Sequence, residues 1–461
     1  MTKRRRFCPG SRTELEWLLD SLSSDMRGAT LADIDISKVD DLSNLYCLSN
    51  FSVAQLSGLA EWDVSHVKNM SHMFAHCKDL SGAVLAYWDV SAVTDMSGMF
   101  QDCESLNDKY LTAWNVSAVK NMSGMFSGCS AVTGRALCGW KVSAAEDMSN
   151  MFHDCRSFTG ESLASWDVSA VKNMSGMFSG CKIFNGKALS NWDVSSVTSM
   201  ESMFYGCELF DGESLGAWDV SAVEDMSGMF SYCSSLTGGA LSGWNVSRVK
   251  DMTDMFRNCF LFDGKSLSGW DMSAVTDTRY MFEDCSSLIS ESLARWKLSS
   301  LTDSEGMFFN CRALSGEGLD NWDVSGVTNM NAMFHQCRAL TGKSLASWDV
   351  SKVTDMGSMF KGCLNFTGES LADWNVSAVE DMDGMFEHCP AFSGRSLAKW
   401  QVPSLDKMGG MFLNCPSFTG EGLTHWQVAE DINAIGAFTG CPSLKLDALP
   451  ETLKKQAVPQ A

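Results

Sequence analysis

Apolar residues recur along this chain with a fixed period of 26 residues. Tryptophan marks the period, and a cysteine follows each tryptophan 15 positions later. Self-similarity at a period of about 20–50 residues, here without insertions, indicates one structural unit stacked on itself as a solenoid. The fifteen tryptophans are Trp62, Trp88, Trp114, Trp140, Trp166, Trp192, Trp218, Trp244, Trp270, Trp296, Trp322, Trp348, Trp374, Trp400 and Trp426.

One copy, residues 166–191, shows the pattern within a repeat. With Trp as offset 0, apolar residues stand at offsets 0, 2, 5, 8, 11, 12, 15, 18 and 23. The alternation at offsets 0 to 2 predicts a short strand. The spacing of Met174, Met177, Phe178 and Cys181 matches one face of a short helical turn. Each coil is therefore expected to be a strand, a turn, a short helical segment and a bend.

Polar and small residues mark the joints of the repeat. An Asp or Asn stands at offset 7 in thirteen of fifteen copies, where it can cap exposed amides at a helix start. A glycine at or near offset 20, as in Gly160, Gly186 and Gly212, fits the bend toward the next coil.

Equal offsets of successive coils stack into ladders of like side chains. Such a core accounts for 16 Trp, 29 Met and 26 Phe without a cofactor. The ladder cysteine stands at an apolar offset, so we expect a small buried hydrophobe in the thiol form. Cys8, Cys47 and Cys138 lie outside this ladder.

The two ends depart from the repeat. Residues 13–26 combine a capping-box pattern with helical apolar spacing, and a weaker copy of the repeat follows them. Open solenoid ends expose core and backbone, so caps are expected. The predicted organisation is a basic tail (1–10), an N-terminal helix with a degenerate capping coil (11–61), the array of fifteen repeats (62–441) and a C-terminal cap or tail (442–461).

Charge and hydropathy exclude several classes of function. A net charge of −21 argues against a nucleic-acid binder, which needs a basic groove. There is no run of 18 apolar residues, so no transmembrane helix is expected. The basic start lacks an apolar segment after it, so we do not expect a secretory signal. Compartment and oligomeric state stay open.

The run W-D-V-S-x-V-x-[ND]-M-S-x-M-F-x-x-C-x-x-[LF]-x-G resembles the 26-residue repeat of bacterial surface proteins, the BspA-like branch of leucine-rich repeats. Residues 88–100 and 166–178 match it almost fully, and the resemblance covers about residues 34–444. It implies a right-handed solenoid with one short parallel strand per coil. It also implies a role in adhesion or host–microbe protein interaction, without catalysis. Many relatives carry a signal peptide or wall anchor, which we do not find here.

An acidic stripe is the first candidate site. Offsets 1 and 3 should point away from the core, and they carry mainly Asp and Ser. These residues can close turns by bonding backbone amides, form a face that binds a basic partner, or share calcium ions between coils. The aspartates are Asp63, Asp89, Asp167, Asp193, Asp219, Asp271, Asp323 and Asp349.

A second candidate is an irregular patch in two adjacent coils. Thr278 and Ser304 replace the usual Met at offset 8, which predicts a softer core whose hydroxyls need partners. Bulk and positive charge accompany them in Arg279, Tyr280, Arg295 and Lys297. The alternative is a specific binding patch.

Metal binding and catalysis find little support in the sequence. His72 and His76 have a spacing that can hold zinc, with His66 nearby, but no further ligands converge on them. No catalytic motif stands apart from the repeat. We therefore expect no metal, no cofactor and no enzyme. The favoured function is an interaction or adhesion solenoid that binds a protein or glycan; the alternatives are an intracellular scaffold or host-delivered effector, and a calcium-dependent structural protein.

Overall fold

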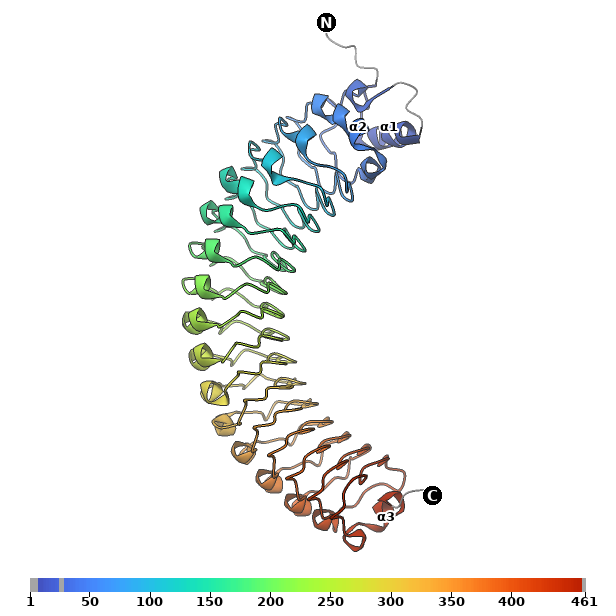
Figure 1. The fold of residues 1–461 in the computed structure, drawn as a ribbon, viewed down its shortest axis with the longest axis vertical. Helices are drawn as coiled ribbons and strands as arrows, with labels where there is room; N and C mark the ends of the chain where they lie inside the picture. The colour runs from blue at the N-terminus through green and yellow to red at the C-terminus, as the bar shows by residue number, and fades with distance from the viewer. Residues whose placement is uncertain (1–6, 25–28, 458–461) are drawn as a thin grey trace. The chain divides into compact units, whose positions relative to one another are not determined.

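The computed structural model describes residues 7–24 and 29–457. Most of the predicted basic tail (residues 1–6) and the last four residues of the predicted C-terminal tail (458–461) lie outside the described residues. The chain forms two compact units, residues 1–223 and 224–461. Within each unit, coils of one 26-residue repeat run side by side, so the solenoid is confirmed (Figure 1).

A backbone ladder at offsets 8 to 14 joins neighbouring coils. Amides at even offsets donate to the next coil; that of Gly98, for example, donates to the carbonyl of Ser123 at 2.7 Å. Amides at odd offsets donate within their own coil, as Met99 does to the carbonyl of Met96 at 3.1 Å. The segment therefore satisfies its buried amides in two directions at once.

This ladder corrects the predicted positions of strand and helix. Trp–Asp–Val forms no strand in the described coils; neighbours pair instead through single parallel bridges at offset 7, such as that between Asp95 and Asn121. The helical turn expected at offsets 8 to 15 is a run of turns. Its helix is interrupted because offsets 10 and 14 are left-handed, with φ of 57° at Gly98 and 58° at Asp102.

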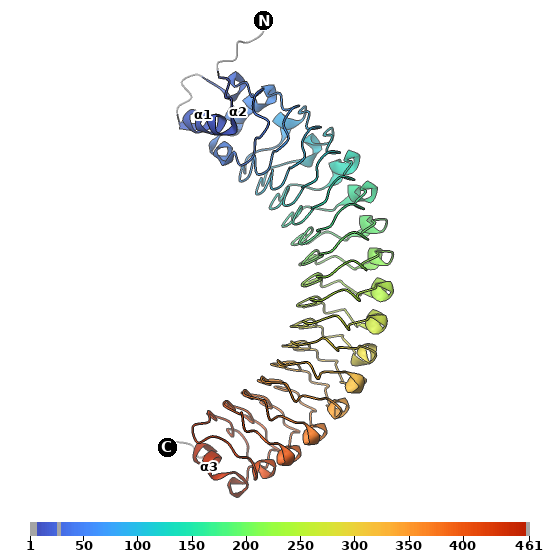
Figure 2. The same ribbon diagram turned by 180° about the vertical axis from the view of Figure 1, so that it is seen from behind.

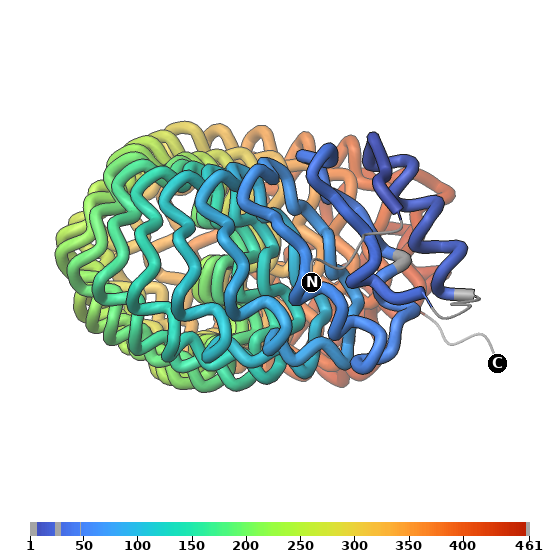
Figure 3. Tube along the Cα trace, turned by 90° about the horizontal axis from the view of Figure 1, so that it is seen from above, coloured from blue at the N-terminus to red at the C-terminus, as the bar shows by residue number. Residues whose placement is uncertain are grey.

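The helical segment of each coil lies at its end, just before the next tryptophan, as a 3-10 turn. These turns follow one edge of each unit (Figures 1 and 2), and within each unit the coils run parallel to one another (Figure 3). In residues 7–223 the helices are α1 (Arg12–Ser24), η1 (Leu31–Asp33), η2 (Tyr46–Asn50), α2 (Val53–Leu56), η3 (Ser57–Glu61), η4 (Ala83–Leu85), η5 (Asp108–Tyr110), η6 (Arg135–Gly139), η7 (Glu161–Ser165), η8 (Lys187–Leu189) and η9 (Glu213–Leu215). In residues 224–457 they are η10 (Gly239–Gly243), η11 (Lys265–Gly269), η12 (Ser290–Leu293), η13 (Leu319–Asn321), η14 (Lys343–Leu345), η15 (Glu369–Asp373), η16 (Arg395–Lys399), η17 (Glu421–Leu423), η18 (Leu446–Ala448) and α3 (Glu451–Ala457).

The glycine bend was predicted correctly. Gly160, Gly186 and Gly212 precede η7, η8 and η9 with φ of 67°, 70° and 81°. At Gly186 a β-carbon would also lie 2.1 Å from the ring of Phe210 in the next coil. Glycine is thus required there by conformation and by space.

The polar atoms of the core ladders are bonded between coils. The indole of Trp88 donates to the carbonyl of Leu59 at 3.1 Å, and the thiol of Cys103 donates to the carbonyl of Phe74 at 3.1 Å. Both patterns recur along the array. The ladder cysteines in the described coils are buried and form no disulfide, and burial raises the pKa of Cys103 far above its usual value. Donation to a carbonyl and this raised pKa both keep the sulfur protonated.

A cap packs on each end of the ladder. Arg12 of α1 donates from Nε to the carbonyl of Ser43 at 2.6 Å, where a preceding coil would bond. Phe7 pairs with Ile34 in a parallel bridge, so it belongs to the cap and not to the predicted tail. At the other end, Leu453 of α3 is buried against the last coil.

Candidate functional site

The acidic stripe closes turns. In all eight of its aspartates, a carboxylate oxygen accepts the backbone amide of the serine two residues later, at 3.0–3.2 Å. The hydrogen bonds from Ser91 lower the pKa of Asp89, and those from Ser273 lower the pKa of Asp271. The residue at offset 7 also closes a turn: a carboxylate oxygen of Asp95, for example, accepts from the backbone amide of Ser97 at 2.8 Å. The turn-forming interpretation thus accounts for the composition of the stripe.

A different set of positions varies from coil to coil. Offset 13 carries eleven residue types in fifteen copies, while its neighbours at offsets 12 and 15 are invariant Phe and Cys. Offsets 9 and 10 vary with it, and offset 10 always has positive φ. We call offsets 9, 10 and 13 the variable face. They lie on the ladder segment, so successive members stand one coil apart.

In the first unit, the variable face forms an open polar groove of about 390 Å³. Serine hydroxyls, glycine backbone and carboxamides make up its wall. At one end the rings of Tyr46 and His72 lie 6.3 Å apart. The groove is lined by His72, Ser97, Gly98, Gln101, Ser123, Gly124, Ser127, Ser149 and Asn150.

In the second unit, the same offsets form a charged network. Arg257 Nε lies 3.0 Å from an oxygen of Glu283, and Arg257 Nη1 lies 3.2 Å from Asp254. The guanidinium also sits 5.8 Å from the ring centre of Tyr280, whose hydroxyl bonds to Glu305. Burial raises the pKa of Glu283 and is the largest cause of the raised pKa of Tyr280. The network therefore consists of partly desolvated charges that bridge coils.

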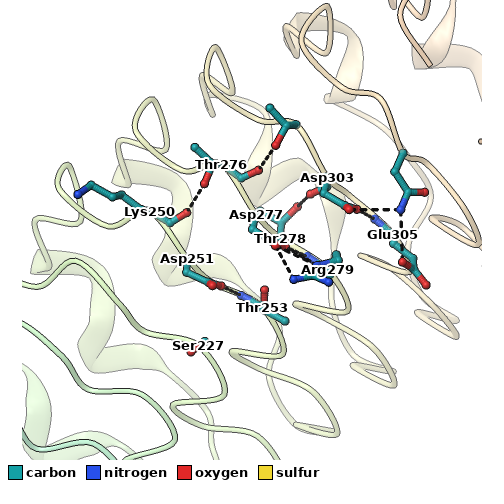
Figure 4. Close-up of polar contacts among 12 residues, drawn as sticks. Ser227, Lys250, Asp251, Thr253, Thr276, Asp277, Thr278, Arg279, Asp303 and Glu305 are labelled. Carbon is teal, nitrogen blue, oxygen red and sulfur yellow. Dashed lines mark hydrogen bonds and ion pairs between the residues drawn. The ribbon is translucent and has the colours of Figure 1, made fainter. Parts of the chain in front are cut away.

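Beside this network runs a row of stacked aspartates. Figure 4 shows Asp251, Asp277 and Asp303 in line, with Arg279 and Glu305 on one side of the row. Burial opposes ionisation of Asp277, but the hydrogen bonds from Arg279 hold its pKa below the usual value. Asp303, by contrast, has a raised pKa because burial outweighs its hydrogen bonds. Neighbouring carboxylates in one row thus differ in their affinity for a proton.

The variable face continues with further pairs at offset 13. The rings of Phe309 and His335 meet edge to face at 4.3 Å, and Lys361 Nζ lies 2.9 Å from Glu387. Burial, with the nearby Lys361, lowers the pKa of His335 to about 4. This histidine is therefore neutral at physiological pH.

The irregular patch divides into three parts. The hydroxyl of Thr278 bonds to the carbonyl of Asp303 at 3.3 Å, and that of Ser304 bonds to the carbonyl of Asn329 at 3.1 Å. Both core hydroxyls thus have local partners. Arg279 and Tyr280 belong to the variable face described above, whereas Arg295 and Lys297 are exposed on either side of Trp296. In the described part of the chain, neither Arg295 nor Lys297 forms a hydrogen bond or ion pair with the other four residues.

Two histidines of the first full coil contact a carboxylate and backbone carbonyls. His76 Nδ1 lies 3.0 Å from a carboxylate oxygen of Asp102, and His66 contacts the carbonyls of Ile36 and Val39 at 3.2 and 3.1 Å. Among residues 7–24 and 29–457, no group of three His, Cys, Asp or Glu side chains is placed to hold an ion. Within those same ranges, no helix has the length and apolar character needed to cross a membrane.

Sequence reasoning placed its candidate binding face at offsets 1 and 3, and the eight aspartates of that stripe are exposed. Alternation from a predicted strand pointed to offsets 1 and 3, whereas the variable face lies at offsets 9, 10 and 13. The signal was present in the sequence, because variation between copies is greatest at offset 13. The structure was needed to show that these variable offsets lie together on the ladder segment.

Together, these features define a protein of tandem 26-residue repeats. The chain belongs to the family described as "Mycoplasma protein of unknown function, DUF285", whose profile matches residues 40–162, 131–233, 209–319 and 302–426. Among curated proteins, none matches this chain significantly.

Proposed function

We propose that the chain is a non-enzymatic interaction solenoid that binds a protein partner through its variable face. One observation carries the proposal: offset 13 changes residue type from coil to coil beside a core that does not change. The fold needs no particular side chain at that offset, so its variety is free to serve recognition. The resemblance to BspA-like repeats supports an adhesion-type role for such a surface.

The charged network favours protein as the partner class. Arg257, Glu283 and Glu305 are held by neighbours in a partly desolvated setting, so their positions are fixed before a partner arrives. Charge-assisted and aromatic contacts of this kind give specificity at protein interfaces. Pre-ordered side chains also reduce the entropy lost on binding.

A glycan is the second candidate, and it rests on the groove of the first unit. Hydroxyls of Ser97, Ser123 and Ser149 and the carboxamide of Gln101 line it, which suits a ligand rich in hydroxyl groups. The rings of Tyr46 and His72 lie near one end and offer an apolar surface.

The test probes arrays of folded proteins and of glycans with labelled full-length chain, and then measures the affinity of each hit for two variants. The double substitution Arg257→Gln with Glu283→Gln removes the network charge. Asp271→Asn is the matched control, because Asn stands at the same offset in three coils and keeps the turn.

For a protein hit, we expect the double variant to bind about ten-fold more weakly, a loss near 1.4 kcal/mol, with the control unchanged. Melting curves measured by circular dichroism check that both variants fold. Equal binding by the double variant, combined with loss in Asp271→Asn, would move recognition to the acidic stripe and refute the variable face. Hits confined to glycans, and weakened by Gln101→Ala, would select the second candidate.

A further inference from the structure

The last coil of the second unit shows what its hydrogen-bond ladder accepts. In the coil before it, the amides of Gly410, Phe412 and Asn414 donate to carbonyls of the last coil at 2.8, 2.9 and 2.8 Å. These three donors stand at alternate residues. Each rung of the stack is therefore one amide facing one main-chain carbonyl of the following segment.

The corresponding amides of the last coil belong to Gly436, Phe438 and Gly440. No residue in the described ranges accepts a hydrogen bond from any of the three. They line an open cavity of about 1160 Å³, together with Ile435, which is 80% exposed. A row of backbone donors with an apolar border thus faces outward.

The α3 helix covers only the first rung of this edge, and it does so by imitating a backbone. Gln456 Oε1 accepts from the amide of Ala434 at 3.1 Å, and its Nε2 donates to the carbonyl of Ile432 at 2.9 Å. The side-chain carboxamide occupies the place of a peptide group of a next coil. The edge therefore selects carbonyl oxygen as its acceptor.

At the opposite edge of the ladder, carbonyls of the first coil already accept hydrogen bonds. Arg12 binds the carbonyls of Ser43 and Asn44 at 2.6 and 3.3 Å, and α1 packs on that end of the first unit. A second copy could not offer these carbonyls to the open amides without losing its own cap. This disfavours a head-to-tail copy as the occupant.

We propose that the open edge binds an extended polypeptide segment of a partner protein. The segment docks through three main-chain carbonyls at alternate residues, onto the amides of Gly436, Phe438 and Gly440, and so adds a partial coil to the stack. Edge addition of this kind takes affinity from the backbone and selectivity from neighbouring side chains. Lys455 at the cavity wall favours acidic side chains in the segment.

The probe is a synthetic peptide with the sequence of residues 381–389 and the substitution Cys389→Ser. This stretch is acidic and already adds to a coil edge in the stack. It is titrated against the full chain, and hydrogen exchange is followed by mass spectrometry with residue-level fragmentation. A control peptide has the three docking carbonyls reduced to methylene groups.

We expect saturating peptide to slow exchange at Gly436, Phe438 and Gly440 by at least about ten-fold, equivalent to roughly 1.4 kcal/mol. The matched amides at Gly410 and Phe412 should not change, because they are already bonded. The reduced peptide should protect none of them. Lys455→Glu should weaken binding of the acidic peptide several-fold, because it reverses the charge at the cavity wall. The variant should still fold, since the Lys455 side chain is exposed.

Three results would overturn the proposal. They are unchanged exchange at millimolar peptide, equal protection by the reduced peptide, or protection that grows with protein concentration alone. The last result would assign the edge to a second copy. This experiment measures amide exchange at the end of the ladder and does not involve the variable face. Its failure would therefore not count against the proposed function.

Discussion

Replacing Gly186 by alanine tests the stacking geometry directly. The residue has φ of 70°, and its new β-carbon would lie 2.1 Å from Cε2 and 2.7 Å from Cδ2 of Phe210, a core ring of the next coil. A left-handed alanine costs about 1–2 kcal/mol, and overpacking a core costs about 1–3 kcal/mol. Reduced freedom of the unfolded chain returns about 0.4–1 kcal/mol. We expect a net loss of about 1–5 kcal/mol in the free energy of unfolding, centred near 3 kcal/mol.

The loss should be local, because solenoid stability is close to a sum over neighbouring coils. Urea denaturation measures the total, and hydrogen exchange locates it. The amides of Leu189 and Leu215, which donate to Gly186 and Gly212 at 2.9 and 3.1 Å, should lose protection.

Gly139→Ala is the matched control in the same unit. Its φ is not positive, and the new β-carbon would meet only the carbonyl of Thr112, at an ordinary 3.6 Å. We expect its stability to change by less than about 1 kcal/mol. If Gly186→Ala matched this control, the left-handed bend and the approach of the Phe210 ring would both be wrong.

Three further predictions address the core and the variable face. Alkylation of the native protein at pH 8 should label the exposed Cys8 and Cys138, while the buried ladder thiols react only after denaturation; rapid native labelling of the ladder would contradict its burial. The pKa of His335 is about 4 in the folded protein and 6.5 ordinarily, so the unfolded chain takes up a proton first as the pH falls. The free energy of unfolding should therefore be highest above pH 6.5 and fall by about 1–2 kcal/mol toward pH 4, allowing for partial exposure. His335→Gln should flatten this part of the pH profile of stability, and an unchanged profile would refute the lowered pKa. The double variant Thr278→Met with Ser304→Met should change the free energy of unfolding by less than about 1 kcal/mol. The apolar area gained is offset by the loss of the two hydroxyl hydrogen bonds. A thermal melt that shows a gain above about 2 kcal/mol would restore the soft-core interpretation.

The 26-residue period was enough to predict the stack and its register. A period of 26 residues without insertions places like side chains on like, and glycine at offset 20 marked the bend correctly. The ladder thiols were also foreseen as a buried apolar column. These features follow from side-chain chemistry repeated at a fixed spacing, which needs no knowledge of the backbone path.

The backbone path within a coil could not be predicted and became visible in the structure. Apolar spacing at offsets 8 to 15 fits a helical turn, yet Gly98 and Asp102 and their equivalents are left-handed, and half of the amides bond to the next coil. The local pattern does not encode that choice, because its hydrogen-bond partners lie one full repeat away in sequence. The same path turns offsets 9, 10 and 13 into one surface, and it leaves three amides of the last coil without an acceptor among residues 7–24 and 29–457. The variable face and the amide edge of the last coil therefore both arise from the geometry between coils. They depend on which backbone groups bond to a neighbouring coil and which do not.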